Sequence, residues 1–149
     1  MPLALGITTN YLMVDSPNLP GSANARFKVT ATDQMNSWED TSDASFTVGR
    51  KGPQAYILSP ELYTTIQPGT PFFLQGYAYD LEDGILNDNS LRWSSDLDGD
   101  LGVGSTVIVS LSSGQHTVTL SATDRDGNSV SSVIHINVGY NIYLPITTR

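Results

Sequence analysis

The stretch Gly114-Gln-His-Thr-Val-Thr-Leu-Ser-Ala-Thr-Asp124 decides the fold class of this chain. Apolar side chains occupy every second position from Val118 to Ala122, which is the pattern of a β-strand with one buried face. The following Asp126-Gly-Asn128 predicts a tight reversal, because glycine and asparagine tolerate the positive φ angles that hairpin turns require. A second alternating run over 130–138 returns along the first. Together these segments predict an antiparallel β-hairpin.

The rest of the composition favours the same class of structure. Of the 149 residues, 39% are hydrophobic, with 13 glycines and 8 prolines. Few segments have a helical period, and short alternating runs are separated by turn residues throughout. Residues 50–139 contain about seven such runs, the strand number and size of an immunoglobulin-like domain. The sequence therefore predicts an all-β fold, an immunoglobulin-like antiparallel β-sandwich preceded by a partial second β-module.

Charge and cysteine content exclude several classes of function. The net charge is −8, from 7 basic and 15 acidic residues, so nucleic acid is not expected as a partner, whereas cations are. The absence of cysteine excludes disulfides, thiolate metal sites and cysteine nucleophiles. No apolar run reaches the roughly 18 residues of a membrane span, and the first residues do not read as a signal peptide. If the protein is exported, we expect its signal to lie outside this chain.

A partial internal repeat divides the chain. Phe27-Lys-Val-Thr-Ala-Thr-Asp33 aligns with the second half of the opening stretch, and 45–49 then aligns with 134–139. Residues 1–49 therefore resemble the C-terminal half of a truncated module, followed by a sandwich over 50–139 and a tail over 140–149. Half a sandwich leaves an apolar face open. We expect that face to pack on the second module, to pair with another chain by self-association, or to be partly disordered.

Three motifs carry a resemblance to a known family. Gly114-x-His-Thr-Val-x-Leu-x-Ala-x-Asp124 resembles the penultimate strand of PKD-type and related bacterial immunoglobulin-like modules. Gly76-x-Ala-x-Asp80-x-Glu-Asp-Gly84 and Leu91-x-Trp93 resemble the second and third strands of the same group, and 26–48 resembles the tail of a fibronectin-III-like module. The resemblance implies an extracellular protein. Such modules are common on cell surfaces and behind the catalytic domains of secreted peptidases and glycosidases.

Acidic residues follow two strands that this fold places on facing sheets. Because both strands run in the same direction, their C-terminal ends meet at one pole of the sandwich. Carboxylates gathered at one pole can hold Ca²⁺, which takes six to eight oxygen ligands. The alternative is turn chemistry, in which aspartate accepts hydrogen bonds from nearby backbone amides. The residues of this predicted calcium site are Asp80, Glu82, Asp83, Asp124 and Asp126.

A second, weaker metal candidate is Asp96-x-Asp98-x-Asp100, which has the alternating carboxylates that begin an EF-hand loop. The remainder of that motif is missing, because Leu101 stands where glycine is needed and Val107 stands where glutamate closes the loop. The alternative interpretation is a turn rich in glycine and aspartate.

Three aromatic residues are candidates for ligand contact. Trp38 is expected in a polar turn over 34–43, where its ring could stack on a sugar or cover the open half module. Tyr77 and Tyr79, with Phe73, are expected on the outer face of the second strand. They could form a ligand platform or an interface between modules.

The interior residues predict structure rather than chemistry. Trp93 is expected to fill the core between the sheets. His116 faces inward near the start of its strand, where related sandwiches place a corner tyrosine that bonds to nearby backbone. Neither histidine has the spacing of a zinc motif or a predicted placement beside a plausible loop nucleophile, and Gly-x-Ser-x-Gly is absent.

These observations favour a non-catalytic module of a larger bacterial secreted or surface protein. Its expected work is spacing, adhesion or substrate positioning, with other domains of the same protein, or protein or polysaccharide at the cell surface, as partners. The alternative is a carbohydrate- or polymer-binding accessory module of a secreted hydrolase. No cofactor is expected to be required, and Ca²⁺ is the one candidate ion.

Overall fold

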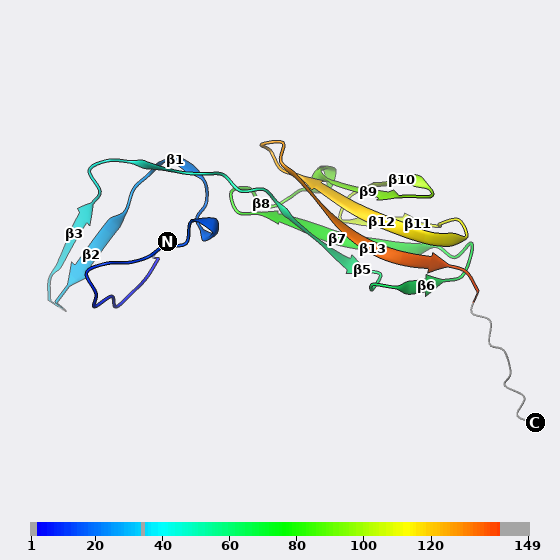
Figure 1. Cartoon of the computed structure of the whole chain (residues 1–149), viewed down its shortest axis with the longest axis horizontal. Coiled ribbons are helices and arrows are strands. Elements are labelled where there is room, and N and C mark those ends of the chain that lie inside the picture. The colour runs from blue at the N-terminus through cyan, green and yellow to red at the C-terminus, as the bar shows by residue number, and fades with distance from the viewer. Residues whose placement is uncertain (1–2, 34, 141–149) are drawn as a thin grey trace, which may run out of the picture. The chain divides into compact units, whose positions relative to one another are not determined.

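A computed structural model describes residues 3–33 and 35–140 and confirms the predicted all-β class (Figure 1). The chain divides into two compact units, Met1–Lys51 and Gly52–Arg149. The division lies within the stretch 49–53, which is rich in glycine and proline. Residues 141–149, which make up most of the predicted C-terminal tail, lie outside the described residues. Helical structure in the described part is limited to the short 3₁₀ turns η1 (Ser16–Asn18) and η2 (Asp88–Ser90), and no helix there is long and apolar enough to cross a membrane.

The second unit is a sandwich of two sheets whose strands pair antiparallel, except for β6. One sheet has the order β10-β9-β12-β13-β6, and the other has the order β11-β7-β5 with β8 paired to β7. Its strands within the described residues are β5 (Gln54–Ser59), β6 (Thr64–Ile66), β7 (Phe72–Asp80), β8 (Gly84–Ile85), β9 (Leu91–Ser95), β10 (Gly99–Val103), β11 (Thr106–Val109), β12 (Gly114–Thr123) and β13 (Ser129–Val138).

The predicted hairpin forms the middle of the larger sheet. Strands β12 and β13 pair in register from Gly114↔Val138 to Thr123↔Ser129, across the predicted turn. Strand β6 adds to β13 in parallel, although β5, which precedes it, belongs to the other sheet. The chain therefore crosses between sheets after its first strand, so β6 does not simply continue β5.

The core lies between the two sheets. The alternating residues of β12 and of β7 face inward, and Trp93 from β9 is fully buried between them, as predicted. Its indole Nε1–H donates a hydrogen bond to the carbonyl oxygen of Gly104 at 3.0 Å, so its one polar atom is satisfied in the interior. The largest fully buried side chains are Leu74, Leu91, Trp93, Leu120, Ile136, His116, Val118 and Asp80.

The first unit is one long, interrupted β-hairpin. Its strands are β1 (Ser22–Ala25), β2 (Lys28–Thr32), β3 (Ser37–Thr41) and β4 (Phe46–Val48). Strand β1 pairs with β4 and β2 pairs with β3, both antiparallel. The end pairs Ser22↔Val48 and Thr32↔Ser37 correspond, in the sequence repeat, to the end pairs of the β12–β13 hairpin. The two halves of the repeat therefore have the same pairing as well as similar sequences.

The two hairpins differ in how much of their apolar side chains is buried. Leu120 of β12 is fully buried, whereas its repeat equivalent Val29 is 65% exposed. Val48 is the one hydrophobic residue of this unit that is buried among the residues described. Trp38 lies on strand β3, opposite Ala31, and not in a turn as expected. The polar residues around Trp38 suggested a turn. The structure shows instead that this segment is a strand that extends the hairpin.

Candidate functional site

The C-terminal ends of β7 and β12 lie at one pole of the sandwich, which we call the acidic pole. Asp80 is the last residue of β7 and Asp124 directly follows β12, and both are buried, at 2% and 7% exposure. Asp83 connects the two loops, because its Oδ2 accepts a hydrogen bond from the backbone N–H of Arg125 at 3.1 Å. The guanidinium of Arg125 lies 3.9 Å from the same carboxylate. The ends of strands from facing sheets thus meet here.

Most of these carboxylate oxygens are engaged in turns. Asp80 Oδ1 accepts hydrogen bonds from the backbone N–H groups of Glu82 and Asp83, each at 2.8 Å. Asp124 accepts from the backbone N–H and the side-chain amide of Asn128, also at 2.8 Å. Burial raises the pKa of Asp124, but the hydrogen bonds from Asn128 and from the backbone N–H groups of Asp126 and Gly127 together outweigh burial, so the net pKa lies below the ordinary aspartate value. Both groups use the turn chemistry of the alternative interpretation.

One oxygen at this pole is not engaged. Asp80 Oδ2 is buried and has no hydrogen-bond partner among the residues described. Asp126, by contrast, lies exposed on the hairpin turn, and Glu82 is half-buried in the loop after β7. In the part of the chain that the structure describes, no three acidic or histidine side chains gather closely enough to hold a metal ion. The calcium site therefore stays a prediction.

The second candidate, at the opposite pole, has three carboxylates with three different partners. Asp96 accepts a hydrogen bond from the backbone N–H of Thr117 at 2.8 Å. Asp98 accepts from the backbone N–H and the hydroxyl of Ser112. Asp100 forms a bidentate ion pair with Arg92 across β9 and β10. Each carboxylate stabilises a loop or a strand pair through its own hydrogen bonds or ion pair. This arrangement agrees with the alternative interpretation, a structural turn.

His116 ties the strand start to this turn. Its Nε2 lies 2.8 Å from the carbonyl oxygen of Ser112, and its Nδ1 lies 2.8 Å from the hydroxyl of Ser95. A carbonyl oxygen can only accept, so Nε2 carries the hydrogen and donates to Ser112, while Nδ1 and the Ser95 hydroxyl share a hydrogen bond. The Ser95 oxygen in turn accepts from the backbone N–H groups of Leu97 and Asp98. The geometry confirms the predicted structural role of His116, which bonds to backbone four residues upstream.

Acid should destabilise this pole through Asp98. The hydroxyl and N–H of Ser112 hold the pKa of Asp98 below its ordinary value, as hydrogen bonds from Thr117 do for Asp96. Because the pKa of Asp98 is lower in the folded state than the unfolded-state value of 3.8, its ionised form stabilises the fold at pH values above 3.8. This stabilisation is lost as the pH falls through the folded-state pKa. We expect the urea midpoint of the second unit to fall steeply below about pH 4. Asp98→Asn should flatten this slope, and equal slopes for variant and wild type would contradict the assignment.

Tyr77 and Tyr79 lie on the outer face of β7, as predicted. Tyr77 stacks on Tyr56 of the neighbouring strand, with ring centroids 5.0 Å apart and an interplanar angle of 18°. The register pairs Tyr56↔Tyr77 and Phe73↔Ile108 place these side chains on one face. We name this surface the aromatic face; its exposed members are Tyr56, Leu58, Phe73, Tyr77, Tyr79 and Ile108. The alternation in the sequence of β5 could have added Tyr56 and Leu58 to the prediction.

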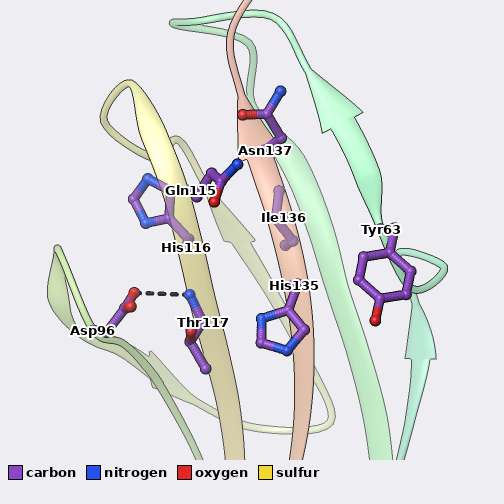
Figure 2. Close-up of a pocket in the computed structure, with 8 residues that line it drawn as sticks. All are labelled: Tyr63, Asp96, Gln115, His116, Thr117, His135, Ile136 and Asn137. Atoms are coloured by element: carbon purple, nitrogen blue, oxygen red, sulfur yellow. Dashed lines mark hydrogen bonds between the residues drawn. The ribbon is translucent and has the colours of Figure 1, made fainter.

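Sequence reasoning missed a depression on the outer face of the other sheet. It has a volume of about 500 Å³ and lies where β12, β13 and the segment before β6 come together (Figure 2). Tyr63 and His135 form one side, with ring centroids 5.9 Å apart. We name this surface the Tyr63 depression; it is lined by Tyr63, Asp96, Gln115, His116, Thr117, His135, Ile136 and Asn137. The alternation of side chains along β12 and β13 predicts which polar residues face the depression. No local sequence pattern predicts that Tyr63 lies beside them.

No protein-family model matches the chain, and no curated protein is significantly similar to it. The surfaces of the described residues therefore carry the functional argument. Two of them differ in character: the aromatic face on β5, β7 and β11 is broad and apolar, and the Tyr63 depression is concave and mostly polar.

Proposed function

We propose that the chain is a non-catalytic β-sandwich segment of a larger secreted or cell-surface protein, where it works by spacing, adhesion or positioning. The observation that carries this proposal is the aromatic face, with six exposed apolar side chains on one side of one sheet. The resemblance to PKD-like modules supports the same role. The buried Ser95–His116 pair also supports it, because its hydrogen bonds hold a turn together.

The aromatic face has the composition of a contact surface. Contiguous exposed apolar patches are uncommon on soluble monomers and mark sites of interaction. Tyrosine and phenylalanine offer large, rigid contact areas at low cost in side-chain entropy, and interfaces are enriched in them. The stacked Tyr56 and Tyr77 rings hold one another in place before any partner arrives. We infer that this face contacts another domain of the parent protein.

A second candidate role is binding of a carbohydrate or other polymer. The specific observation that favours it is the near-parallel stack of Tyr56 and Tyr77, with Tyr79 along the same strand. An exposed aromatic ring can pack against the apolar face of a sugar residue. In this role the module holds a secreted hydrolase on its substrate.

Hydroxyl-radical footprinting tests the leading role. In the complete parent protein, Tyr77 and Tyr79 should be labelled several-fold more slowly than in the isolated chain, because a neighbouring domain covers them. Tyr63, on the opposite sheet, serves as the control and should be labelled at the same rate in both. Equal labelling of Tyr77 and Tyr79 in the two proteins would remove the inter-domain role.

Pull-down on insoluble polysaccharides tests the second candidate. Tyr77→Thr with Tyr79→Thr should weaken binding at least about tenfold, since central aromatic residues of an interface often contribute 2 kcal/mol or more. Val133→Thr changes an exposed apolar residue on the other sheet and is the matched control. No binding by the intact chain would eliminate the polymer-binding role and leave the footprinting prediction standing.

The first unit supports a further contact through its open hairpin. Phe27, Val29 and Trp38 are exposed, and Phe27 stacks on Phe46 with centroids 4.7 Å apart. The β12 equivalents of Phe27 and Val29, which are Val118 and Leu120, are fully buried in the second unit. Self-association of two chains through these residues would remove them from water. It should protect Trp38 in the footprinting experiment as the chain concentration rises.

Calcium at the acidic pole is also a proposal, supported by the buried and unpartnered Asp80 Oδ2 and by the hydrogen bond through which Asp83 joins the two loops of this pole. A ligand that binds only the native state raises its stability, so excess Ca²⁺ should raise the melting temperature above that in EDTA. Asp80→Asn should remove this response, whereas Asp96→Asn at the other pole should preserve it. Superimposable melts with Ca²⁺ and with EDTA would exclude the site.

A further inference from the structure

We infer that the Tyr63 depression binds a neutral saccharide. This inference goes beyond the proposed contact role, because the depression lies on the β12–β13 sheet and the aromatic face lies on the other sheet. Its volume of about 500 Å³ falls within the roughly 300–1,000 Å³ of small-ligand pockets. Figure 2 shows one aromatic wall and a floor of polar side chains from two adjacent strands.

Tyr63 provides the aromatic wall in an unusual conformation. Its φ of 61° lies in the left-handed region, which is costly for a bulky side chain. The backbone N–H of Tyr63 donates to the carbonyl oxygen of His135 at 3.1 Å, and its ring stacks on the His135 ring at an interplanar angle of 20°. Even so, Tyr63 remains 74% exposed. The structure thus places a large ring at the rim of the depression, where a backbone hydrogen bond and ring stacking hold it without burying it.

The floor provides hydrogen-bonding groups that suit hydroxyls. Gln115 and Asn137 are directly opposite one another on β12 and β13, and Thr117 is opposite His135. Each amide side chain offers both donors and an acceptor. Neither amide makes a hydrogen bond within the described part of the chain. Paired hydroxyls on a pyranose ring present donors and acceptors at similar spacing, while the ring's apolar face can rest on Tyr63.

Charge selects a neutral ligand over an anionic one. The depression contains the carboxylate of Asp96, whose pKa is lowered by the N–H of Thr117, so the group is anionic at neutral pH. Among the residues that the structure describes, no lysine or arginine lines the depression, and the chain carries a net charge of −8. Phosphate and uronate groups would therefore meet repulsion without a compensating cation. Uncharged sugars avoid this repulsion and can donate to the Asp96 carboxylate.

Affinity electrophoresis of the full chain tests the inference. Native gels contain soluble dextran, galactomannan, xyloglucan or mixed-linkage β-glucan, with polygalacturonate as the anionic comparison. We expect retardation by at least one neutral polysaccharide and none by polygalacturonate. Tyr63→Asn should weaken the interaction about tenfold, because it removes the ring while asparagine tolerates the left-handed backbone. Tyr63→Phe should retain it, and Asn137→Ala should weaken it several-fold.

Control variants separate this site from the aromatic face. Val133→Thr changes an exposed apolar residue outside both surfaces and should leave the retardation unchanged, and Tyr63→Asn should melt at the wild-type temperature because Tyr63 is a surface residue. The inference is overturned if no neutral polysaccharide retards the chain or if Tyr63→Asn binds like the wild type. Stronger retardation by polygalacturonate would also overturn it. Loss of binding in Tyr79→Thr but not in Tyr63→Asn would assign the saccharide to the aromatic face and reject the depression.

Discussion

Replacement of Trp93 by alanine is expected to lower the free energy of unfolding of the second unit by about 3–5 kcal/mol. Trp93 is fully buried at the centre of the core, opposite Leu120 in the β9–β12 pairing. Its removal leaves a cavity between the two sheets, and the hydrogen-bonded sheets cannot easily move together to fill it. It also leaves the carbonyl of Gly104 without its indole donor, which adds to the loss. Domains of this size are stable by only about 5–15 kcal/mol, so the expected loss is a large share of the total stability.

The second tryptophan provides the matched control. Trp38 is 59% exposed on β3, so Trp38→Ala should change stability by no more than about 0.5 kcal/mol. Urea unfolding followed by far-UV circular dichroism measures both variants without relying on tryptophan emission. Trp93→Phe, which keeps a ring but loses the indole donor, should fall between them. Similar urea midpoints for Trp93→Ala and Trp38→Ala would contradict the assigned core.

Replacement of Gly76 by valine is the second change with a large expected effect, a destabilisation of about 1–3 kcal/mol or more. A Cβ at position 76 would lie 2.6 Å from Leu120 Cδ2, 2.8 Å from the carbonyl oxygen of Tyr56 and 3.1 Å from Trp93 Cζ2. The side chains could shift, but the carbonyl belongs to the paired strand β5 and cannot move without breaking the sheet register. Gly76 therefore allows the two sheets to approach.

Two variants distinguish lack of space from a general effect of replacing glycine. Gly139→Ala adds a Cβ whose nearest neighbour is the Asn137 side chain at 3.7 Å, so it should be nearly neutral. Gly76→Ala should already destabilise, and Leu120→Ala should partly rescue it by removing the closest atom. If the destabilisations of the two single variants simply add in the double variant, the contact between position 76 and Leu120 is not the cause of the effect.

Strand positions and faces follow directly from the sequence. The alternation around Val118 and Leu120 predicts both the strand and its buried side, because successive side chains of a strand point to opposite faces. The repeat likewise predicts the hairpin of the first unit, whose end pairs match those of β12 and β13. These properties are local in origin, so no tertiary partner is needed to infer them.

Burial and site geometry depend on what covers each face. Val29 and Leu120 occupy equivalent positions in similar strands, yet Leu120 is covered by a facing sheet and Val29 is not. The same limit applies to the Tyr63 depression, because Tyr63 and His135 are far apart in the chain and meet only where β6 joins β13. The opening hairpin was thus determined by its own alternating residues. What lies over each of its faces was decided by the sheet order, since burial is a property of two packed surfaces and not of one strand.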